Sequence, residues 1–498
     1  MSHVDVLIVG AGISGIGAAC HLRQMCPGKR FTILEARDAI GGTWDLFRYP
    51  GIRSDSDMHT LGFRFKPWRE AKAIADGPAI RRYVNETALE NGITRHIRFG
   101  HKVRTASWSS ERAQWTVTAE CGDETVTFTC GFLFMCGGYY SYEHAHTPDF
   151  EGMDDFQGTV VHPQFWPEDL DYAGKRVVVI GSGATAMTLV PAMAEGGAEV
   201  TMVQRSPTYV VSRPDQDRIA NTLRRWLPEK WAYAITRFKN VQLQRYFYHR
   251  TRTAPEKVKH KLLDMVRDQL GPDYDVDTHF TPRYNPWDQR LCLVPNADLF
   301  EAIKSGQATV VTDHIDRITE RGLRLKSGRE LTADIIVTAT GLEMVVLSGV
   351  EFSVDGRRVD FPETFTYKGM MYSGVPNLAQ TFGYINASWT LRADLTSEYV
   401  CRLLNHMDAI GMRQCTPTLR PEDADMTPRP WIDDFSAGYM RRVMHLFPKQ
   451  GDRDPWRNTQ DYAQDKRMVR RGPIDDGALV FSHPVDRDRA AETTPVAA

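Results

Sequence analysis

No two cysteines of this chain stand in a C-x-x-C spacing. The eight cysteines are scattered, at positions 20, 26, 121, 130, 136, 292, 401 and 415. This pattern argues against a cysteine-ligated metal and against a dithiol redox centre, so we expect no metal site. The sequence also shows no secretory signal, because Asp5 and a glycine turn interrupt the first apolar stretch and no basic segment precedes it. Reduced thiols and a cytoplasmic location are therefore expected.

An excess of positive charge is also absent. The chain has 61 lysines and arginines against 63 aspartates and glutamates, which gives a net charge of −2. Nucleic-acid binding requires a basic surface, so no nucleic-acid partner is expected. Long apolar runs are equally scarce. The 18 residues from 177 to 194 carry no charge and could be mistaken for a membrane span, but their glycines favour a buried strand followed by a helix.

Two glycine-rich motifs, each preceded by a short apolar run, stand out in what is present. Residues 10–15 (GAGISG) follow Val6–Val9, and residues 181–186 (GSGATA) follow Val177–Ile180. Each pattern predicts a buried strand, a tight turn and a helix whose N-terminus binds a pyrophosphate. The candidate cofactor contacts are Gly10, Gly12, Ser14 and Gly15 in the first motif and Gly181, Ser182, Gly183, Ala184, Thr185 and Ala186 in the second.

The residues that follow the two motifs differ in charge. After the first motif, the strand Phe31–Leu34 ends in Glu35, whose carboxylate can accept hydrogen bonds from ribose hydroxyls and repels a 2′-phosphate. After the second motif, the strand Val200–Val203 leads to Arg205 and Ser206, and a cation with a hydroxyl suits a 2′-phosphate. The sequence therefore predicts a redox enzyme that binds FAD at the first motif and NADPH at the second.

The predicted fold class is α/β, with two dinucleotide-binding, Rossmann-like domains in a chain of 498 residues. The FAD domain is expected to be discontinuous, formed by residues 1–145 and 342–485, and the NADP domain to span residues 150–341. A stretch of about 212–270, rich in arginine, lysine, tryptophan and tyrosine, predicts a helical insertion. It is compatible with a solvated amphipathic pair of helices, with a lid, or with peripheral membrane contact. The polar tail, 486–498, is expected to be disordered.

Two further motifs resemble a known family. Residues 156–167 (FQGTVVHPQFWP) resemble the F-x-G-x-x-x-H-x-x-x-W-P fingerprint of type I Baeyer–Villiger monooxygenases, and residues 42–55 (GTWDLFRYPGIRSD) resemble that family's second signature. Related flavin-containing and N-hydroxylating monooxygenases usually have tyrosine or phenylalanine where Trp166 stands. The resemblance spans nearly the whole chain. Segments 49–58 and 285–296 are similar to the ethionamide-activating monooxygenase subgroup of mycobacteria.

The resemblance implies roles for several residues. It implies that Arg290 is a catalytic cation and that Asp55 faces the flavin and pairs with this arginine. His162 and Trp166 are implied to form a structural hinge rather than an acid–base pair. Where many family members have lysine before the arginine, this chain has Gln289, which leaves the 2′-phosphate to Arg205 and Ser206. The remaining candidate cofactor contacts are Gly42, Thr43, Trp44, Asp45 and Val103, the last in a strand expected at 102–107.

The implied reaction inserts one atom of O₂ next to a ketone carbonyl to give an ester or lactone, with reducing equivalents from NADPH. Oxidation of thioether or thioamide sulfur is a possible second activity, and the substrate is expected to be a small ketone or sulfur compound. A flavin-containing N- or S-monooxygenase and a non-catalytic flavin- and NADPH-binding redox sensor are the alternatives. The absence of C-x-x-C counts against a disulfide-reductase-like flavoprotein. The sequence does not indicate an oligomeric state.

Overall fold

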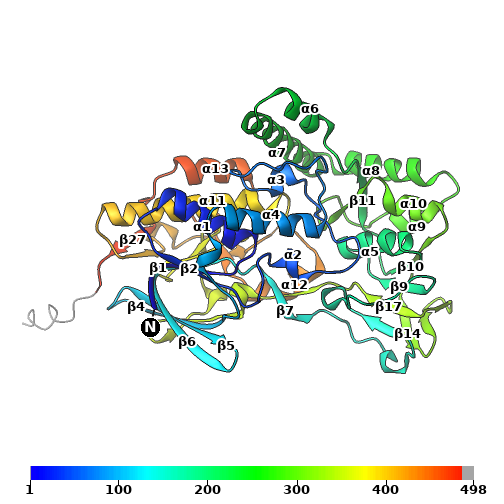
Figure 1. The fold of residues 1–498 in the computed structure, drawn as a ribbon, viewed down its shortest axis with the longest axis horizontal. Helices are drawn as coiled ribbons and strands as arrows, with labels where there is room; N and C mark the ends of the chain where they lie inside the picture. The colour runs from blue at the N-terminus through cyan, green and yellow to red at the C-terminus, as the bar shows by residue number, and fades with distance from the viewer. Residues whose placement is uncertain (1, 434, 485–498) are drawn as a thin grey trace, which may run out of the picture.

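The computed structural model describes residues 2–433 and 435–484 of the chain (Figure 1). The tail predicted at 486–498 lies outside the described residues. Two sheets with helices packed against them make up most of the molecule, in agreement with the predicted α/β class. Among the described helices, none combines the length and the apolar character needed to cross a membrane.

The first sheet has nine strands in the order β20-β19-β4-β5-β6-β1-β2-β3, with β23 paired to β6. Its parallel centre places Val6 opposite both Phe31 and Phe132. Alternate residues of β1 enter different cores: Val6 and Ile8 face the cluster under the helices, and Leu7 faces the opposite one. The strands are β1 (Ser2–Val9), β2 (Phe31–Leu34), β3 (Ile97–Arg98), β4 (Lys102–Ser109), β5 (Gln114–Cys121), β6 (Glu124–Met135), β19 (Glu351–Val354), β20 (Arg357–Arg358) and β23 (Leu378–Gln380).

Helices α1 (Ile13–Met25), α4 (Gly77–Glu90) and α11 (Trp389–Ala409) cover one face of this sheet (Figure 1). Strands β19 and β23 come from residues beyond 342, so the chain returns to its first sheet after the second one is complete. This return supports the proposed discontinuous first domain.

The second sheet is entirely parallel, in the order β13-β10-β9-β17-β8. Its neighbouring strands β9 and β17 are nearly continuous apolar runs because both faces of the sheet are buried there. The strands are β8 (Thr159–Val161), β9 (Arg176–Ile180), β10 (Glu199–Gln204), β13 (Ala308–Thr312) and β17 (Ile335–Thr338). One face packs against α5 (Ala184–Glu195) and α10 (Asp298–Lys304), and the other against the antiparallel strands β14 (Ile315–Thr319), β15 (Gly322–Leu325) and β16 (Glu330–Thr332). The uncharged run 177–194 thus forms most of β9 and α5.

Two linkers join the sheets and lie side by side. Strand β7 (Tyr140–Ala145) leaves the first sheet, β18 (Leu342–Met344) leads back to it, and the two pair antiparallel. The hydroxyl of Thr340 donates to the carbonyl of His146 at 2.7 Å beside this ribbon.

The insertion contains three helices, one more than the amphipathic pair that was one interpretation of the sequence. They are α6 (Arg218–Trp226), α7 (Glu229–Thr253) and α8 (Pro255–Leu270). Pro228 and Pro255 explain the breaks, because proline lacks the N–H that a continuing helix needs and fits the first turn of the next one. Strands β11 (Tyr209–Arg213) and β12 (Leu291–Pro295), which pair in parallel, flank the insertion.

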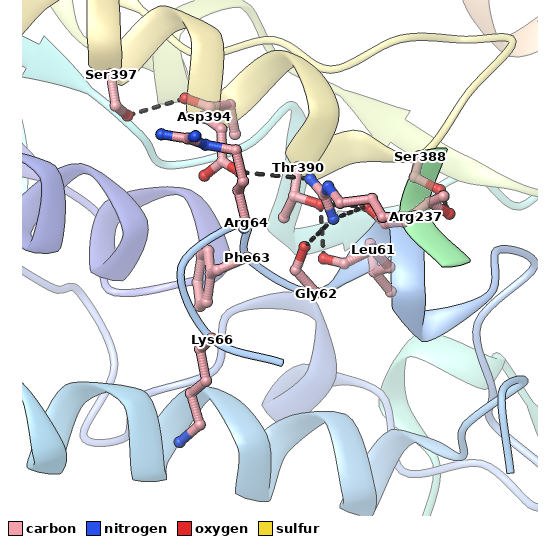
Figure 2. Close-up of polar contacts among 12 residues, drawn as sticks. Leu61, Gly62, Phe63, Arg64, Lys66, Arg237, Ser388, Thr390, Asp394 and Ser397 are labelled. Atoms are coloured by element: carbon pink, nitrogen blue, oxygen red, sulfur yellow. Dashed lines mark hydrogen bonds and ion pairs between the residues drawn. The ribbon is translucent and has the colours of Figure 1, made fainter. Parts of the chain in front are cut away.

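Helix α7 is fixed to the first unit through a buried arginine (Figure 2). The guanidinium of Arg237 donates to the carbonyls of Gly62 at 2.7 Å and His59 at 2.9 Å, and it pairs with Asp394 of α11 at 3.4 Å. The hydroxyl of Thr390 donates to the Leu61 carbonyl at 2.6 Å. These contacts hold the segment around α3 (Met58–Leu61) between α7 and α11.

The remaining elements are α2 (Thr43–Leu46), α9 (Val276–Phe280), α12 (Gly438–Val443), α13 (Tyr462–Arg471), β21 (Thr366–Tyr367), β22 (Met371–Tyr372), β24 (Gln414–Pro417), β25 (Arg429–Pro430), β26 (Lys449–Gln450) and β27 (Leu479–Ser482).

Candidate active site

The first glycine motif forms a turn that leaves no room for side chains. Gly10 has φ +102°, and a Cβ there would lie 2.8 Å from the carbonyl oxygen of Cys136. A Cβ on Gly15 would lie 1.9 Å from the oxygen of Gly10, so α1 starts directly against the turn. The hydroxyl of Ser14 accepts a hydrogen bond from Trp389 Nε1 at 2.7 Å. Gly10, Gly12 and Gly15 therefore leave the backbone at the start of α1 uncovered on the side of the turn, as binding a pyrophosphate requires.

Glu35 closes this turn from the end of β2. Its side chain is buried, and its carboxylate accepts the backbone N–H of Ala11 at 2.6 Å and that of Arg37 at 2.9 Å. Burial raises the pKa of Glu35, although these hydrogen bonds act in the opposite direction. The carboxylate therefore holds the glycine turn in place, at the end of β2 where a ribose contact is predicted.

The segment 42–55 begins against the first motif. Gly42 has φ +57°, and a Cβ there would lie 3.0 Å from Gly12 Cα. Thr43 starts the short helix α2, and Trp44 is half-buried against the core beneath the helices of the first unit. Asp45, only 2 % exposed, accepts hydrogen bonds from three arginines. They are Arg37 at 2.5 Å, Arg81 at 3.0 Å and Arg48 at 3.2 Å.

The pKa of Asp45 lies below its ordinary value. Burial disfavours the charged carboxylate, but the hydrogen bonds from Arg37 and Arg81 outweigh burial. Arg37 therefore connects the two parts of the first site, since its backbone N–H binds Glu35 and its guanidinium binds Asp45.

The second half of segment 42–55 packs on the second unit. Tyr49 is buried in the core around α5 and hydrogen-bonds Thr185. A Cβ on Gly51, which has φ +75°, would lie 2.7 Å from the Cβ of Ala192 in α5. Arg53 pairs with Asp298 at the start of α10. One continuous segment thus links the two glycine motifs and carries Asp55 to the boundary between the units.

Asp55 and Arg290 are close enough for their charges to interact. Asp55 is exposed to solvent by surface area, yet enough protein surrounds it for burial to raise its pKa. The guanidinium groups of Arg290 and Arg53 act against this increase. In the part of the chain that the structure describes, no direct ion pair joins Asp55 to Arg290. Their charges therefore influence each other without a direct ion pair.

Three tyrosines lie close enough to Arg290 to affect its pKa. The pKa of Arg290 is raised, chiefly by Tyr439 and against the effect of burial, and Tyr139, Tyr140 and Asp55 contribute in the same direction as Tyr439. Burial raises the pKa of Tyr139 to about 12, so its phenol keeps its proton at neutral pH. The guanidinium therefore stays positively charged in a setting formed largely by aromatic rings.

The loop that carries Arg290 is held from both sides. The carbonyl of Asp288 accepts hydrogen bonds from the backbone N–H and the hydroxyl of Ser436, at 2.8 and 3.0 Å. Its carboxylate pairs with Arg252 near the end of α7 at 2.8 Å. Ser436 belongs to a segment whose aromatic residues form a buried cluster with Phe382. The insertion and the C-terminal region thus both determine the position of Arg290.

The second glycine motif is more open than the first. Gly181 has φ +138°, and a Cβ there would lie 2.3 Å from the carbonyl oxygen of Ala339, but a Cβ on Gly183 would meet no atom within 4 Å. The hydroxyl of Ser182 donates to the Ser206 carbonyl at 3.0 Å, which joins the motif to the end of β10. Arg205 and Ser206 are exposed, and within the described ranges Arg205 has no ion-pair partner. Ala184 and Thr185 begin α5, and Ala186 is fully buried in it.

His162 occupies a position that does not require acid–base chemistry. Its Nδ1 accepts the backbone N–H of Gln164 at 3.1 Å, so the proton is on Nε2, which donates to the carbonyl of Gly341 at 3.2 Å. Burial lowers its pKa, which favours the neutral ring. Trp166 packs at the edge of the core of the second unit. His162 therefore ties the end of β8 to the residue that precedes β18.

Several residues at the site were not found from the sequence. Tyr139, Tyr140 and Tyr439 meet Arg290 only in the folded chain, and Arg37 has no motif of its own. A local signal exists for two of these: Arg37 lies two residues beyond Glu35, and Tyr139 follows the glycines that end β6. Val103 lies in β4 with its side chain buried in the sheet core, which leaves only its backbone available to a cofactor.

Comparison with known proteins agrees with these features. A model of flavin-binding monooxygenase-like proteins matches residues 73–272, and one of NAD(P)-binding Rossmann-like domains matches residues 8–77. FAD-containing monooxygenase EthA of Mycobacterium tuberculosis is 56 % identical over 481 residues, covering 96 % of this chain and 98 % of the relative. The chain belongs to the family of FAD-containing monooxygenases. The predicted cofactors, FAD and NADPH, are confirmed at the level of this family.

Other relatives of this monooxygenase extend the comparison. The putative FAD-containing monooxygenase MymA of M. tuberculosis is 50 % identical, covering 98 % of this chain and 99 % of the relative. Among solved structures, a steroid monooxygenase bound to NADP superposes with a TM-score of 0.70 at 24 % identity, over 84 % of this chain and 88 % of that one. OTEMO in complex with FAD and NADP gives 0.74 at 20 % identity, over 96 % and 99 %. These structural likenesses confirm the predicted fold class.

Proposed function

We propose that this monooxygenase is a Baeyer–Villiger enzyme that inserts one oxygen atom of O₂ next to the carbonyl of a small ketone, giving an ester or a lactone. The observation that carries the proposal is the setting of Arg290. A guanidinium, which stays charged at all pH values that proteins tolerate, lies near Tyr439, Tyr139 and Asp55, where the 42–55 segment approaches the second unit. The two motifs that resemble type I Baeyer–Villiger monooxygenases, 42–55 and 156–167, point to the same reaction class.

The residues present fit both cofactors. The side-chain-free turn at Gly10 and Gly15, with Glu35 beside it, would hold FAD. The open motif at Gly183, followed by the exposed Arg205 and Ser206, would hold NADPH. When bound, the pair supplies reducing equivalents and the activation of O₂.

Arg290 would stabilise negative charge on the reacting oxygen. A fixed cation acts strongly where protein replaces water, and a preorganised cation needs no rearrangement during the reaction. The Asp288 contacts with Ser436 and Arg252 keep its loop in one position. Asp55 would orient the guanidinium and balance part of its charge.

Oxidation of sulfur in thioethers or thioamides is a second candidate. It is favoured by the phenols next to Arg290, because Tyr139 retains its proton and can donate a hydrogen bond to a reacting oxygen. The same site would then serve carbon and sulfur substrates.

The decisive experiment supplies the FAD-loaded enzyme with NADPH, ¹⁸O₂ and a panel of linear, cyclic and aryl ketones, and identifies products by mass. We expect an ester or lactone with one labelled oxygen per NADPH consumed. Consumption of NADPH with hydrogen peroxide as the sole product from every ketone would contradict the proposal. A labelled sulfoxide without any ester would favour the second candidate.

Arg290→Ala should leave FAD bound but lower the rate of ester formation by about 10²–10³, the usual cost of losing one preorganised electrostatic partner. Arg283→Ala is the matched control, because it removes an exposed arginine from the same loop.

Asp55→Ala should slow flavin reduction in stopped-flow measurements as well as ester formation. Parent-like ester formation by Arg290→Ala would exclude the assigned role.

A further inference from the structure

Exposed apolar side chains gather on helices α6 and α7. Of the fourteen large hydrophobic residues that are exposed in the described part of the chain, seven lie on these two helices. Trp226 is 81 % exposed, Trp231 67 % and Phe238 66 %. The seven are Ile219, Trp226, Trp231, Ile235, Phe238, Leu243 and Tyr246, and we call them the α6–α7 patch. Soluble surfaces rarely concentrate such residues unless something covers them.

The patch lies on the face of α7 that points away from the protein. Trp231, Ile235 and Phe238 are spaced by four and three residues, so they line one side of the helix. Tyr233, Arg237 and Asn240 are buried on the opposite side, where Arg237 makes the contacts of Figure 2. Both helices project from one edge of the molecule (Figure 1). The patch is therefore not a core face left open by poor packing.

Positive charge surrounds the patch. Residues 218–253 contain nine lysines and arginines but a single acid, Glu229, which is paired with Arg69. Some of these cations are engaged, such as Lys239 with Asp217. Within the described residues, Arg218, Arg225 and Lys230 have no ion-pair partner, and the last two flank Trp226 and Trp231 in sequence. The partner of this surface must therefore tolerate or neutralise several cations.

We propose that the α6–α7 patch docks on the surface of an anionic lipid bilayer. α7 would lie in the plane of the interface, with the tryptophans, the tyrosine and the aliphatic side chains of the α6–α7 patch among the lipids and the neighbouring cations on the headgroups. Tryptophan and tyrosine suit this boundary because each has an apolar body and a polar edge.

A second copy of the chain fits the patch less well. In a twofold contact, Arg225 and Lys230 of one copy would face the same cations of the other, with the only acid of the segment already paired. An anionic bilayer satisfies the apolar residues and the cations together. The C-terminal end of the same helix holds the Arg290 loop through Arg252 and Asp288, so the docked helix is connected to the proposed active site.

The test is co-sedimentation of the FAD-loaded enzyme with vesicles. Vesicles of equal parts phosphatidylglycerol and phosphatidylcholine should bind it, with binding weakened by salt, and pure phosphatidylcholine vesicles should bind it far less. Trp226→Ser combined with Trp231→Ser should weaken binding at least about tenfold. Leu89→Ser combined with Phe165→Ser is the matched control, because it removes two exposed apolar residues elsewhere.

Arg225→Glu combined with Lys230→Glu is a second variant and leaves the apolar residues in place. It should abolish the preference for phosphatidylglycerol. Thermal unfolding and FAD content establish that each variant is folded, and if the tryptophan variant is not, the charge variant decides. The proposal would be overturned if the parent enzyme does not bind phosphatidylglycerol vesicles. It would also be overturned if both patch variants bind these vesicles as well as the parent does. If light scattering shows that the parent is a dimer and the tryptophan variant a monomer, and the parent does not bind vesicles, the patch is instead an interface with a second copy of the chain.

Discussion

The two glycine motifs build the same strand, turn and helix, but one is closed and the other open. In the first, a Cβ on Gly12 would meet Gly42 Cα at 3.5 Å, and Glu35 is buried with its carboxylate bound to backbone N–H groups. In the second, Gly183 faces open space and Arg205 is exposed without an ion-pair partner in the described residues. The corresponding third position is glycine in the first motif and alanine, Ala186, in the second.

This difference matches the different tasks expected of the two cofactors. A ligand enclosed by buried backbone and a buried carboxylate can leave only when those elements move, so it stays with the protein. A ligand held by an exposed arginine and an open turn can be exchanged in each cycle. We infer that the first unit is built for resident FAD and the second for NADPH that comes and goes.

Exchange of the third residue between the motifs should have the largest effect. Gly15→Ala places a Cβ 1.9 Å from the Gly10 oxygen, so α1 must shift, and we expect a loss of about 4 kcal/mol or more in unfolding free energy, together with loss of FAD. Ala186→Gly creates no clash and should cost about 1 kcal/mol, the usual price of glycine inside a helix. Denaturant unfolding and the FAD-to-protein ratio measure both. Equal losses in the two variants would remove the distinction between a closed and an open motif.

Arg205→Ala should have the next largest effect. An arginine–phosphate contact contributes about 1.5–3 kcal/mol, so affinity for NADPH should fall roughly 10- to 150-fold. NADH has no 2′-phosphate, so its kcat/KM should not change. The ratio of kcat/KM for NADPH to that for NADH should therefore fall, because the value for NADPH falls. Gln289 supplies no second cation to mask the loss. Arg321→Ala, which removes another exposed arginine of the same unit, is the control. An equal loss of affinity for NADPH and NADH would show that residues other than Arg205 bind the 2′-phosphate.

Asp45→Asn should have the smallest effect and should depend on pH. The folded-state pKa of Asp45 lies below its ordinary value of 3.8, so its stabilisation is present above that value and is lost as pH falls through the lowered pKa. Arg48 and Arg81 are more than one-third exposed and contribute little, so we expect about 1 kcal/mol, mostly through Arg37. Unfolding free energies measured from neutral pH down to about pH 2 should converge for parent and variant. A constant gap across this range would show that the carboxylate charge is irrelevant.

Features formed by residues close together in the sequence could be predicted, whereas contacts between residues far apart in the sequence could not. A glycine turn and the charge after the next strand are local features, so residues 10–15, Glu35 and Arg205 could be recognised directly. The tyrosines around Arg290 come from residues 139, 140 and 439, and no spacing rule joins positions so far apart. The insertion was visible as an arginine- and aromatic-rich stretch, but the third helix depended on two prolines whose effect is certain only in context. The roles given to Asp55 and Arg290 stay predictions until the variants above are measured.

The paired linkers have a mechanical consequence. Strands β7 and β18 pair antiparallel, with Tyr140 opposite Met344 at one end and Ala145 opposite Leu342 at the other. This two-stranded strap resists stretching, because extension would break its hydrogen bonds, but it can bend out of its own plane. The strap is not the sole tie between the two units in the described residues, because Gly51 packs on α5, Arg53 pairs with Asp298, and Ser436 holds the Asp288 carbonyl beside Arg290. Bending at the strap would therefore strain the Ser436 contact first and shift the loop that carries Arg290. The hydrogen bonds of Glu35 to the first turn lie within the first unit and would be unaffected.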